Sequence, residues 1–166
     1  RLRLIDFPMG DISAWRPPSR RSASSPRVTV SGTKWVLDGT PIERLMLLRE
    51  PFADAPSRGR LNYATADLTR AFQRVRAAGD QPMVHAVGDA AIDAVLAALE
   101  ASGGEAWRRL RPRIEHGDLL QPDQFARARR LGVIVVQNPS HFMIPEVMAA
   151  RLGPARAARN QPVKSA

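Results

Sequence analysis

The chain has 166 residues and no cysteine, and 44% of its residues are hydrophobic and 25% charged. This length predicts one domain or one piece of a larger domain, and the apolar fraction argues against general disorder. The missing cysteines exclude disulfides and thiolate metal sites, and they fit a reducing, cytoplasmic location. No apolar run approaches the roughly 20 residues that a bilayer crossing needs, so we expect no membrane partner.

Basic residues outnumber acidic ones by 25 to 16, which gives a formal net charge of +9. A nucleic-acid partner is disfavoured nevertheless, because the arginines form no single block and aromatic residues, which stack on bases, make up only 5%. Lys34 and Lys164 are the two lysines of the sequence. A lysine within an apolar stretch, as Lys34 is, therefore calls for a chemical explanation.

The first third of the chain predicts two strands and two irregular segments. Residues 1–9 are strand-like, and residues 10–26, rich in serine and proline, predict a loop or a weakly ordered connection. Residues 27–37 are rich in β-branched side chains and end at the turn Asp38-Gly39. Residues 40–63 show little periodicity and predict an excursion with one short helix.

Strands and helices alternate through the rest of the chain. Apolar spacing predicts a helix from Thr65, its cap, to about residue 78, and a second one from its cap Asp89 to about residue 101. Further helices are expected over 122–132 and 145–160, and short apolar strands over 82–87, 112–116 and 133–136.

This alternation predicts an α/β fold with a parallel sheet covered by helices. A doubly wound sheet and part of a (β/α)₈ TIM barrel both fit the pattern. Because a complete barrel needs about 250 residues, this chain would be a barrel fragment or a small open sheet. The sequence also begins without methionine and without the apolar stretch of a signal peptide, so we expect it to start inside a longer protein.

The three histidines and Lys34 lie in strands or follow them closely. His85, His116 and His141 occupy or follow strand ends, where α/β proteins carry their sites. Imidazoles that converge there suit Zn²⁺ or a similar divalent ion. Two histidines do not fill a tetrahedral shell, so a carboxylate would have to contribute if this chain supplied every ligand. The candidates are Asp38, Asp89, Glu115 and Asp118. The sequence contains no Gly-x-Ser-x-Gly elbow, dinucleotide loop or P-loop.

Four motifs in this order resemble the amidohydrolase superfamily, in its family 3 branch of N-substituted formamide deformylase-like metal-dependent hydrolases. They are Thr33-Lys-Trp-Val-Leu-Asp-Gly39, His85-Ala-Val-Gly-Asp89, Arg113-Ile-Glu-His116 and Val135-Val-Gln-Asn-Pro-Ser-His141. The resemblance implies that residues 1–166 are the central part of a metal-dependent (β/α)₈ barrel, roughly strands 3 to 7 with their helices.

The resemblance also implies roles for individual residues. Lys34, His85 and His116 would bind one or two divalent metal ions, with Zn²⁺ expected and Lys34 carboxylated on its amine. Asn138 and His141 would face the substrate, and Asp89 would cap its helix and support His85. The family's His-x-His on strand 1 and its catalytic aspartate on strand 8 have no counterpart here, so we expect the general base beyond residue 166.

These observations predict an incomplete catalytic domain of a hydrolase that cleaves C–N bonds in a small amide or formamide. We expect the 166 residues alone to be inactive. Two alternatives stay open: a non-catalytic α/β binding module with incidental histidines, and a basic nucleic-acid-binding domain. The sequence does not determine the substrate, the metal or the oligomeric state, and a homo-oligomer is compatible with it.

Overall fold

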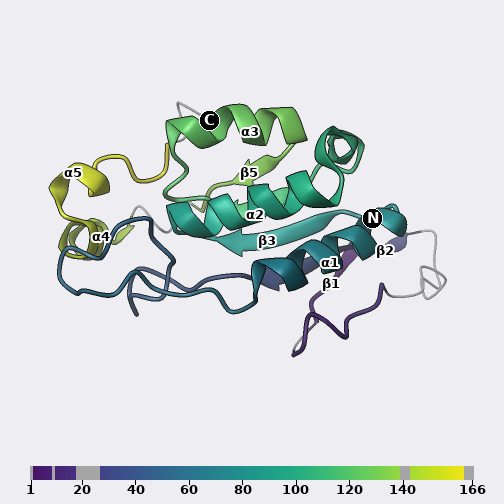
Figure 1. The fold of residues 1–166 in the computed structure, drawn as a ribbon, viewed down its shortest axis with the longest axis horizontal. Coiled ribbons are helices and arrows are strands. Elements are labelled where there is room, and N and C mark those ends of the chain that lie inside the picture. Colours follow the sequence, from purple (N-terminus) through teal and green to yellow (C-terminus); the bar gives the residue numbers. More distant parts are fainter. Residues whose placement is uncertain (1, 9, 18–26, 139–142, 163–166) are drawn as a thin grey trace.

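Five parallel strands form one sheet in the computed structural model, which describes residues 2–8, 10–17, 27–138 and 143–162 (Figure 1). The strands are β1 (Leu2–Asp6), β2 (Val28–Val36), β3 (Pro82–Ala86), β4 (Arg113–His116) and β5 (Ile134–Val136). Their order in the sheet is β1-β2-β3-β4-β5. A doubly wound sheet reverses its strand order at a switch point, whereas barrel strands follow one another in chain order. The observed order is that of consecutive strands in a (β/α)₈ barrel.

Three helices lie side by side over one face of this sheet (Figure 1). They are α1 (Thr65–Ala77), α2 (Asp89–Ser102) and α3 (Pro122–Leu131), and the 3₁₀ helix η2 (Gly104–Arg109) follows α2. Glycines end the helices as the sequence predicts. Gly132 follows α3 with φ of 72°, a left-handed conformation that glycine adopts without steric cost.

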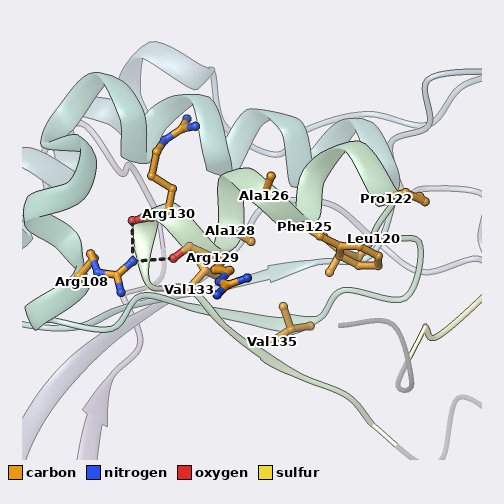
Figure 2. A pocket seen from close by; sticks show the side chains of 10 residues that line it. All are labelled: Arg108, Leu120, Pro122, Phe125, Ala126, Ala128, Arg129, Arg130, Val133 and Val135. Atoms are coloured by element: carbon orange, nitrogen blue, oxygen red, sulfur yellow. Dashed lines mark hydrogen bonds between the residues drawn. The ribbon is translucent and has the colours of Figure 1, made fainter.

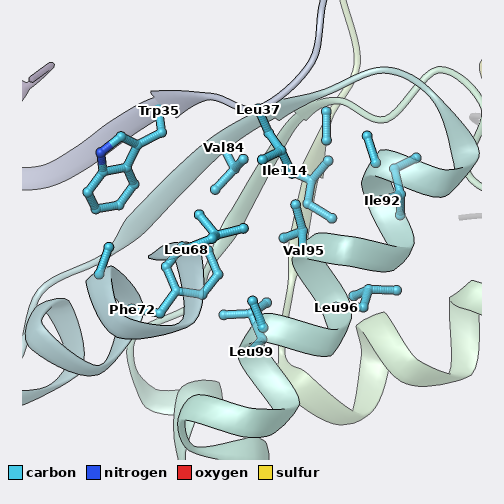
Figure 3. Close-up of a cluster of buried hydrophobic side chains, with 14 of the residues drawn as sticks. Trp35, Leu37, Leu68, Phe72, Val84, Ile92, Val95, Leu96, Leu99 and Ile114 are labelled. Carbon is cyan, nitrogen blue, oxygen red and sulfur yellow. The ribbon is translucent and has the colours of Figure 1, made fainter. Parts of the chain in front are cut away.

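The main core lies between the sheet and these helices (Figure 3). Trp35, Val84 and Ile114 point into it from three neighbouring strands and are at most 1% exposed. Phe72 of α1 packs between two tryptophans, with ring centroids 6.2 Å from Trp35 and 6.0 Å from Trp107. Burying one large apolar side chain stabilises a fold by about 1.5–3 kcal/mol, so this cluster is the main source of stability.

A second apolar cluster lies where β3 and β4 end. It joins the loop 38–64 to the helix α4 (Pro145–Leu152), and the short helix α5 (Pro154–Ala157) follows. Its buried members are Met46, Leu48, Phe52, Val87, Leu119, Met148 and Leu152. Arg44 and Arg151 both pair with Asp54 of the loop. The carboxyl ends of the central strands are therefore overlaid by a packed layer.

The structure corrects several local predictions. Within 40–63, all of which it describes, the chain forms turns where a short helix was expected. The N-caps of α1 and α2 are Ala64 and Gly88, each one residue before the predicted Thr65 and Asp89, because these preceding residues have extended backbones. The region 145–160 is divided at Gly153, since Pro154 cannot donate the backbone hydrogen bond that would continue α4.

The predicted loop 10–26 is described only over 10–17, and residues 18–26 lie outside the described residues. Ile12 and Trp15 are buried in the main core, at 4% and 8% exposure. The Trp15 indole also donates to Asp6 at 2.9 Å. This part of the predicted connection therefore packs against the sheet.

Candidate metal centre

The sheet face opposite the helices carries charged side chains. Lys34 pairs in register with Met83, and Met83 with Arg113. Two residues further along, His85 pairs with Val36 and with Glu115. Side chains at paired positions of a parallel sheet share a face, and successive residues alternate between faces. Lys34, His85 and Glu115 therefore lie on the face opposite the core.

His116 reaches this group through an unusual backbone conformation. It pairs with Ala86, so regular alternation would turn its side chain toward the helices. Its φ is 74°, in the left-handed region that non-glycine residues rarely occupy. The imidazole rings of His85 and His116 are 4.6 Å apart between centroids and meet edge to face at 69°. The bend at the end of β4 thus brings together the two histidines that the sequence placed at neighbouring strand ends.

Lys34 lies lower on the same face. Val36 is the residue that pairs with His85, and Lys34 lies two residues before Val36. The two positions are about 7 Å apart along the strand. A cavity of about 330 Å³ beside it is lined by Ile5, Phe7, Met83, Arg113 and Glu115. Burial lowers the pKa of Lys34 to about 8, with Glu115 opposing the decrease and Arg113 adding to it. Its amine therefore loses a proton far more readily than that of a surface lysine.

Asp38, one of the four carboxylates that the sequence offered as candidates, lies beside His85 in the structure. It follows β2 and is 0% exposed, and its carboxylate accepts backbone N–H groups of Leu47, Val87 and Gly88, each at 3.0 Å. Burial raises the pKa of Asp38 to about 7 against these hydrogen bonds, and nearby Asp118 adds to the increase. The His85 Nε2 atom lies 3.6 Å from Asp38 Oδ1. The sequence indicated a turn at Asp38-Gly39 and a candidate carboxylate at Asp38, and its closeness to His85 depends on the fold.

The structure places the other predicted residues as follows. The carboxylate of Asp89 accepts from the backbone N–H groups of Arg49, at 2.8 Å, and Ala90, at 2.9 Å. The Asp38 carboxylate lies 3.6 Å from His85 Nε2, and Glu115 is paired with His85 in the sheet. Asn138 is half-buried, and its carbonyl accepts from the Gln161 side chain at 3.3 Å. His141 lies outside the described residues.

The donors gathered here are fewer than a metal ion needs. Among the residues that the structure describes, no group of three or more histidines and carboxylates is arranged to hold a metal ion. The paired imidazoles of His85 and His116 are the donor type that zinc prefers. Lys34 adds an amine that is readily neutralised. The set therefore fits a metal site that takes further ligands from elsewhere.

A larger cavity, of about 850 Å³, lies between α3 and β5 (Figure 2). Its described walls are apolar side chains and the three arginines Arg108, Arg129 and Arg130. Arg108 is held by the carbonyls of the other two arginines, at 2.9 and 3.3 Å. Among the described residues, the histidines and Lys34 lie at the other face of the sheet and not in this cavity, so its size does not make it the candidate site.

None of the helices in the described part of the chain is long and apolar enough to cross a membrane. A lysine and two histidines on one face, beside a buried aspartate, can hold a cation and orient a polar substrate.

Comparisons with known proteins identify related chains. The model of the amidohydrolase family matches residues 7–166. The putative amidohydrolase YtcJ of Bacillus subtilis (strain 168) is 31% identical over 121 residues, which are 72% of this chain and 22% of that protein. The Arabidopsis thaliana protein LONG AFTER FAR-RED 3 is 29% identical over 135 residues, 78% of this chain and 23% of that protein.

Two crystal structures share the fold. An uncharacterized metal-dependent hydrolase from Pyrococcus furiosus matches with a TM-score of 0.76 and 29% identity, over 86% of this chain and 29% of that one. A second, from Pyrococcus horikoshii OT3, matches with a TM-score of 0.74 and 32% identity, over 84% and 28%. The chain thus spans between a fifth and a third of the length of the relatives that it matches.

Proposed function

Because this chain belongs to the amidohydrolase family, we propose that it is part of a metal-dependent hydrolase that cleaves C–N bonds of small amides or formamides. The observation that carries the proposal is the close pair of His85 and His116 at the ends of adjacent strands, with Lys34 on the same face. Two structural neighbours bear the name metal-dependent hydrolase, which supports the same reaction class.

We propose that His85, His116 and Lys34 hold one or two divalent ions, Zn²⁺ above all. Imidazoles suit zinc, and a lysine carboxylated on Nζ would add carboxylate-like oxygens. The lowered pKa of Lys34 favours this modification, because only the neutral amine reacts with carbon dioxide. When bound, the metal supplies an activated water and polarises the substrate carbonyl. Asn138 and His141, which follow β5, are proposed to contact the substrate.

The remaining parts of the site are proposed to lie elsewhere in a longer protein. The general base would be an aspartate beyond residue 166, and further ligands would come from strands before β1. The relatives support this division, because the chain spans 22% and 23% of the two sequence relatives. We therefore expect residues 1–166 alone to give no turnover of amides or formamides in the presence of Zn²⁺, while the full-length protein does.

Two substitutions in the full-length protein test the assignment. His85→Ala and His116→Ala should each reduce bound metal and hydrolysis by at least about 100-fold, because changes to groups that merely support a ligand already cost about 10–100-fold. Metal content by mass spectrometry and hydrolysis of an amide and formamide panel are the readouts. Glu146→Ala, at an exposed position of α4, is the control, and circular dichroism verifies folding. Full metal content and activity in both histidine variants would refute the proposal.

A further inference from the structure

Arg49 joins the loop 38–64 to two of the helices that cover the sheet. Its guanidinium donates to both carboxylate oxygens of Asp93 in α2, at 2.7 and 2.9 Å, and to both oxygens of Asp123 in α3, at 3.1 and 2.7 Å. Its backbone N–H also donates to Asp89, the first residue of α2, at 2.8 Å. Two-point arginine–carboxylate pairs fix direction as well as distance, so both helices define the position of Arg49.

The acceptors on the two helices are held together without Arg49. Asp93 also accepts from Gln124 at 2.9 Å and from Arg127 at 3.1 Å, both of α3. The Gln124 side chain donates in addition to the Asp89 carbonyl at 2.8 Å, and α2 and α3 lie side by side (Figure 1). Arg49 therefore binds to a helix pair that is already tied together, and the part whose position it determines is the loop.

The loop that Arg49 holds borders the candidate metal centre. Leu47 donates its backbone N–H to Asp38 at 3.0 Å, and the Leu45 carbonyl accepts from the Gly39 N–H at 3.2 Å. The Gly39 carbonyl oxygen in turn lies 3.4 Å from the His85 Nε2 atom. Residues 40–63 form turns and no helix or strand, so a regular backbone ladder does not fix the loop. Its order therefore depends on its buried apolar side chains and on Arg49.

We propose that Arg49 is a positioning residue that holds residues 45–48 beside the site through its ion pairs with α2 and α3. The side chains of Arg49, Asp93 and Asp123 are 36%, 32% and 60% exposed, so water and salt reach them. Salt screens exposed ion pairs, and the hold on the loop should therefore weaken as ionic strength rises. The effect on hydrolysis rests on the proposed function, whereas the order of the loop is a property of the protein without metal or substrate.

Two variants and a control separate this role from general stabilisation. Arg49→Met removes the charge and keeps an apolar stem, and Arg49→Lys keeps the charge but cannot form two-point pairs with both carboxylates. Arg130→Met is the matched control, because Arg130 of α3 also pairs with a carboxylate, that of Glu100 in α2, at 2.8 Å. That pair joins the same two helices without the loop, so its loss should leave residues 45–48 ordered.

Hydrogen exchange of the full-length protein, followed by mass spectrometry, measures the order of residues 45–48. Their amides are hydrogen-bonded, such as that of Leu48 to the Arg58 carbonyl at 2.8 Å. Exchange is compared at about 0.01 M and about 1 M salt, where the Debye length is about 30 Å and about 3 Å. Salt should accelerate it by up to about 10-fold in the unchanged protein and in Arg130→Met. In Arg49→Met, exchange should already be fast at low salt and change little with salt, and Arg49→Lys should lie between.

Hydrolysis assays then connect the order of the loop to the site. Arg49→Met should raise KM by about the same factor by which it accelerates exchange, while kcat changes less, because the binding-competent form of the loop is less populated. A purely structural role would instead lower the folded fraction and leave the KM of the folded protein unchanged.

Two results would overturn the inference. One is exchange of residues 45–48 that does not respond to salt in the unchanged protein, a measurement that decides the matter even if Arg49→Met does not fold. The other is a folded Arg49→Met variant with fast exchange and the original KM. If exchange behaves as expected but the unchanged protein hydrolyses no amide or formamide, Arg49 still orders the loop and the proposed function fails.

Discussion

The helix-covered face of the sheet and its opposite face are built from the same strands but differ in burial and charge. Trp35, Val84 and Ile114 on the covered face are apolar and at most 1% exposed. Lys34, His85 and Glu115 on the other face are half-buried and ionisable. Each charged residue is the direct chain neighbour of a core residue. Because successive side chains of a strand point to opposite faces, residues that stabilise the core alternate with residues that carry ionisable groups.

This comparison shows why the register of the sheet matters for the site. A shift of one residue in any strand would move its core side chains to the site face and its charged side chains into the core. The packing of Trp35 against Phe72 therefore also fixes the height of Lys34. Stability and site geometry are coupled through register, although different residues supply them.

The largest expected difference between the two faces can be measured at two adjacent residues of β2. Trp35→Ala should lower the free energy of unfolding by about 3–5 kcal/mol, because it leaves a large cavity in the core. Lys34→Met should change it far less and yet abolish metal binding, since it removes a proposed ligand and keeps the volume. Denaturant unfolding and metal analysis of both variants are the measurements. Equal loss of stability would show that the two faces are not separate.

The pH dependence of stability tests the charged face directly. The pKa of Lys34 is lowered to about 8 in the fold, so the unfolded chain binds more protons between pH 8 and 10.5. Stability should therefore rise with pH in this window, by up to about 3 kcal/mol, and the penalty of the buried cation should be complete below pH 8. Lys34→Met should lack this rise. Unfolding in metal-free buffer without carbon dioxide measures the difference, and parallel curves for both proteins would contradict it.

A substitution at Gly88 tests how closely the loop 38–64 must approach the end of β3. Gly88→Ala should destabilise the protein by about 1–3 kcal/mol, because the added methyl group would overlap the Leu47 backbone. Its φ of −75° is ordinary, so the effect arises from contact and not from backbone strain. Gly104→Ala is the comparison, because a Cβ there meets nothing within 4 Å and only its φ of 54° opposes alanine. Thermal unfolding should rank Gly88→Ala as the more harmful change.

The smallest expected effect concerns the layer over the strand ends. Hydrogen bonds from Arg44 and then Arg151 lower the pKa of Asp54 to about 2. The Asp54 contribution to stability should therefore be present above pH 4 and be lost as pH falls toward 2. Asp54→Asn should lose this part of the acid dependence while the main core keeps the variant folded. Acid unfolding followed by tryptophan fluorescence tests this, and identical profiles would exclude a role for the pair.

Much of the secondary structure could be predicted from local sequence patterns. The 3.6-residue spacing around Leu68 and Ile92 predicted α1 and α2, and glycines such as Gly132 marked where helices end. These signals are local, because amphipathic spacing and glycine conformation depend on the nearest residues. The same reasoning placed Lys34, His85 and His116 in strands or at their ends, and the alternation of strands and helices indicated a parallel sheet.

The tertiary structure decided the order of the strands, which distinguishes a barrel arc from a doubly wound sheet. It also decided that the His116 ring turns toward His85, through a left-handed backbone that no sequence period encodes. It placed Asp38 beside His85, and it brought the backbone N–H of Arg49, in the loop 38–64, to the carboxylate of Asp89. Register, burial and hydrogen-bond partners join residues that lie far apart in the chain. They depend on how the elements pack, so a local sequence pattern does not contain them.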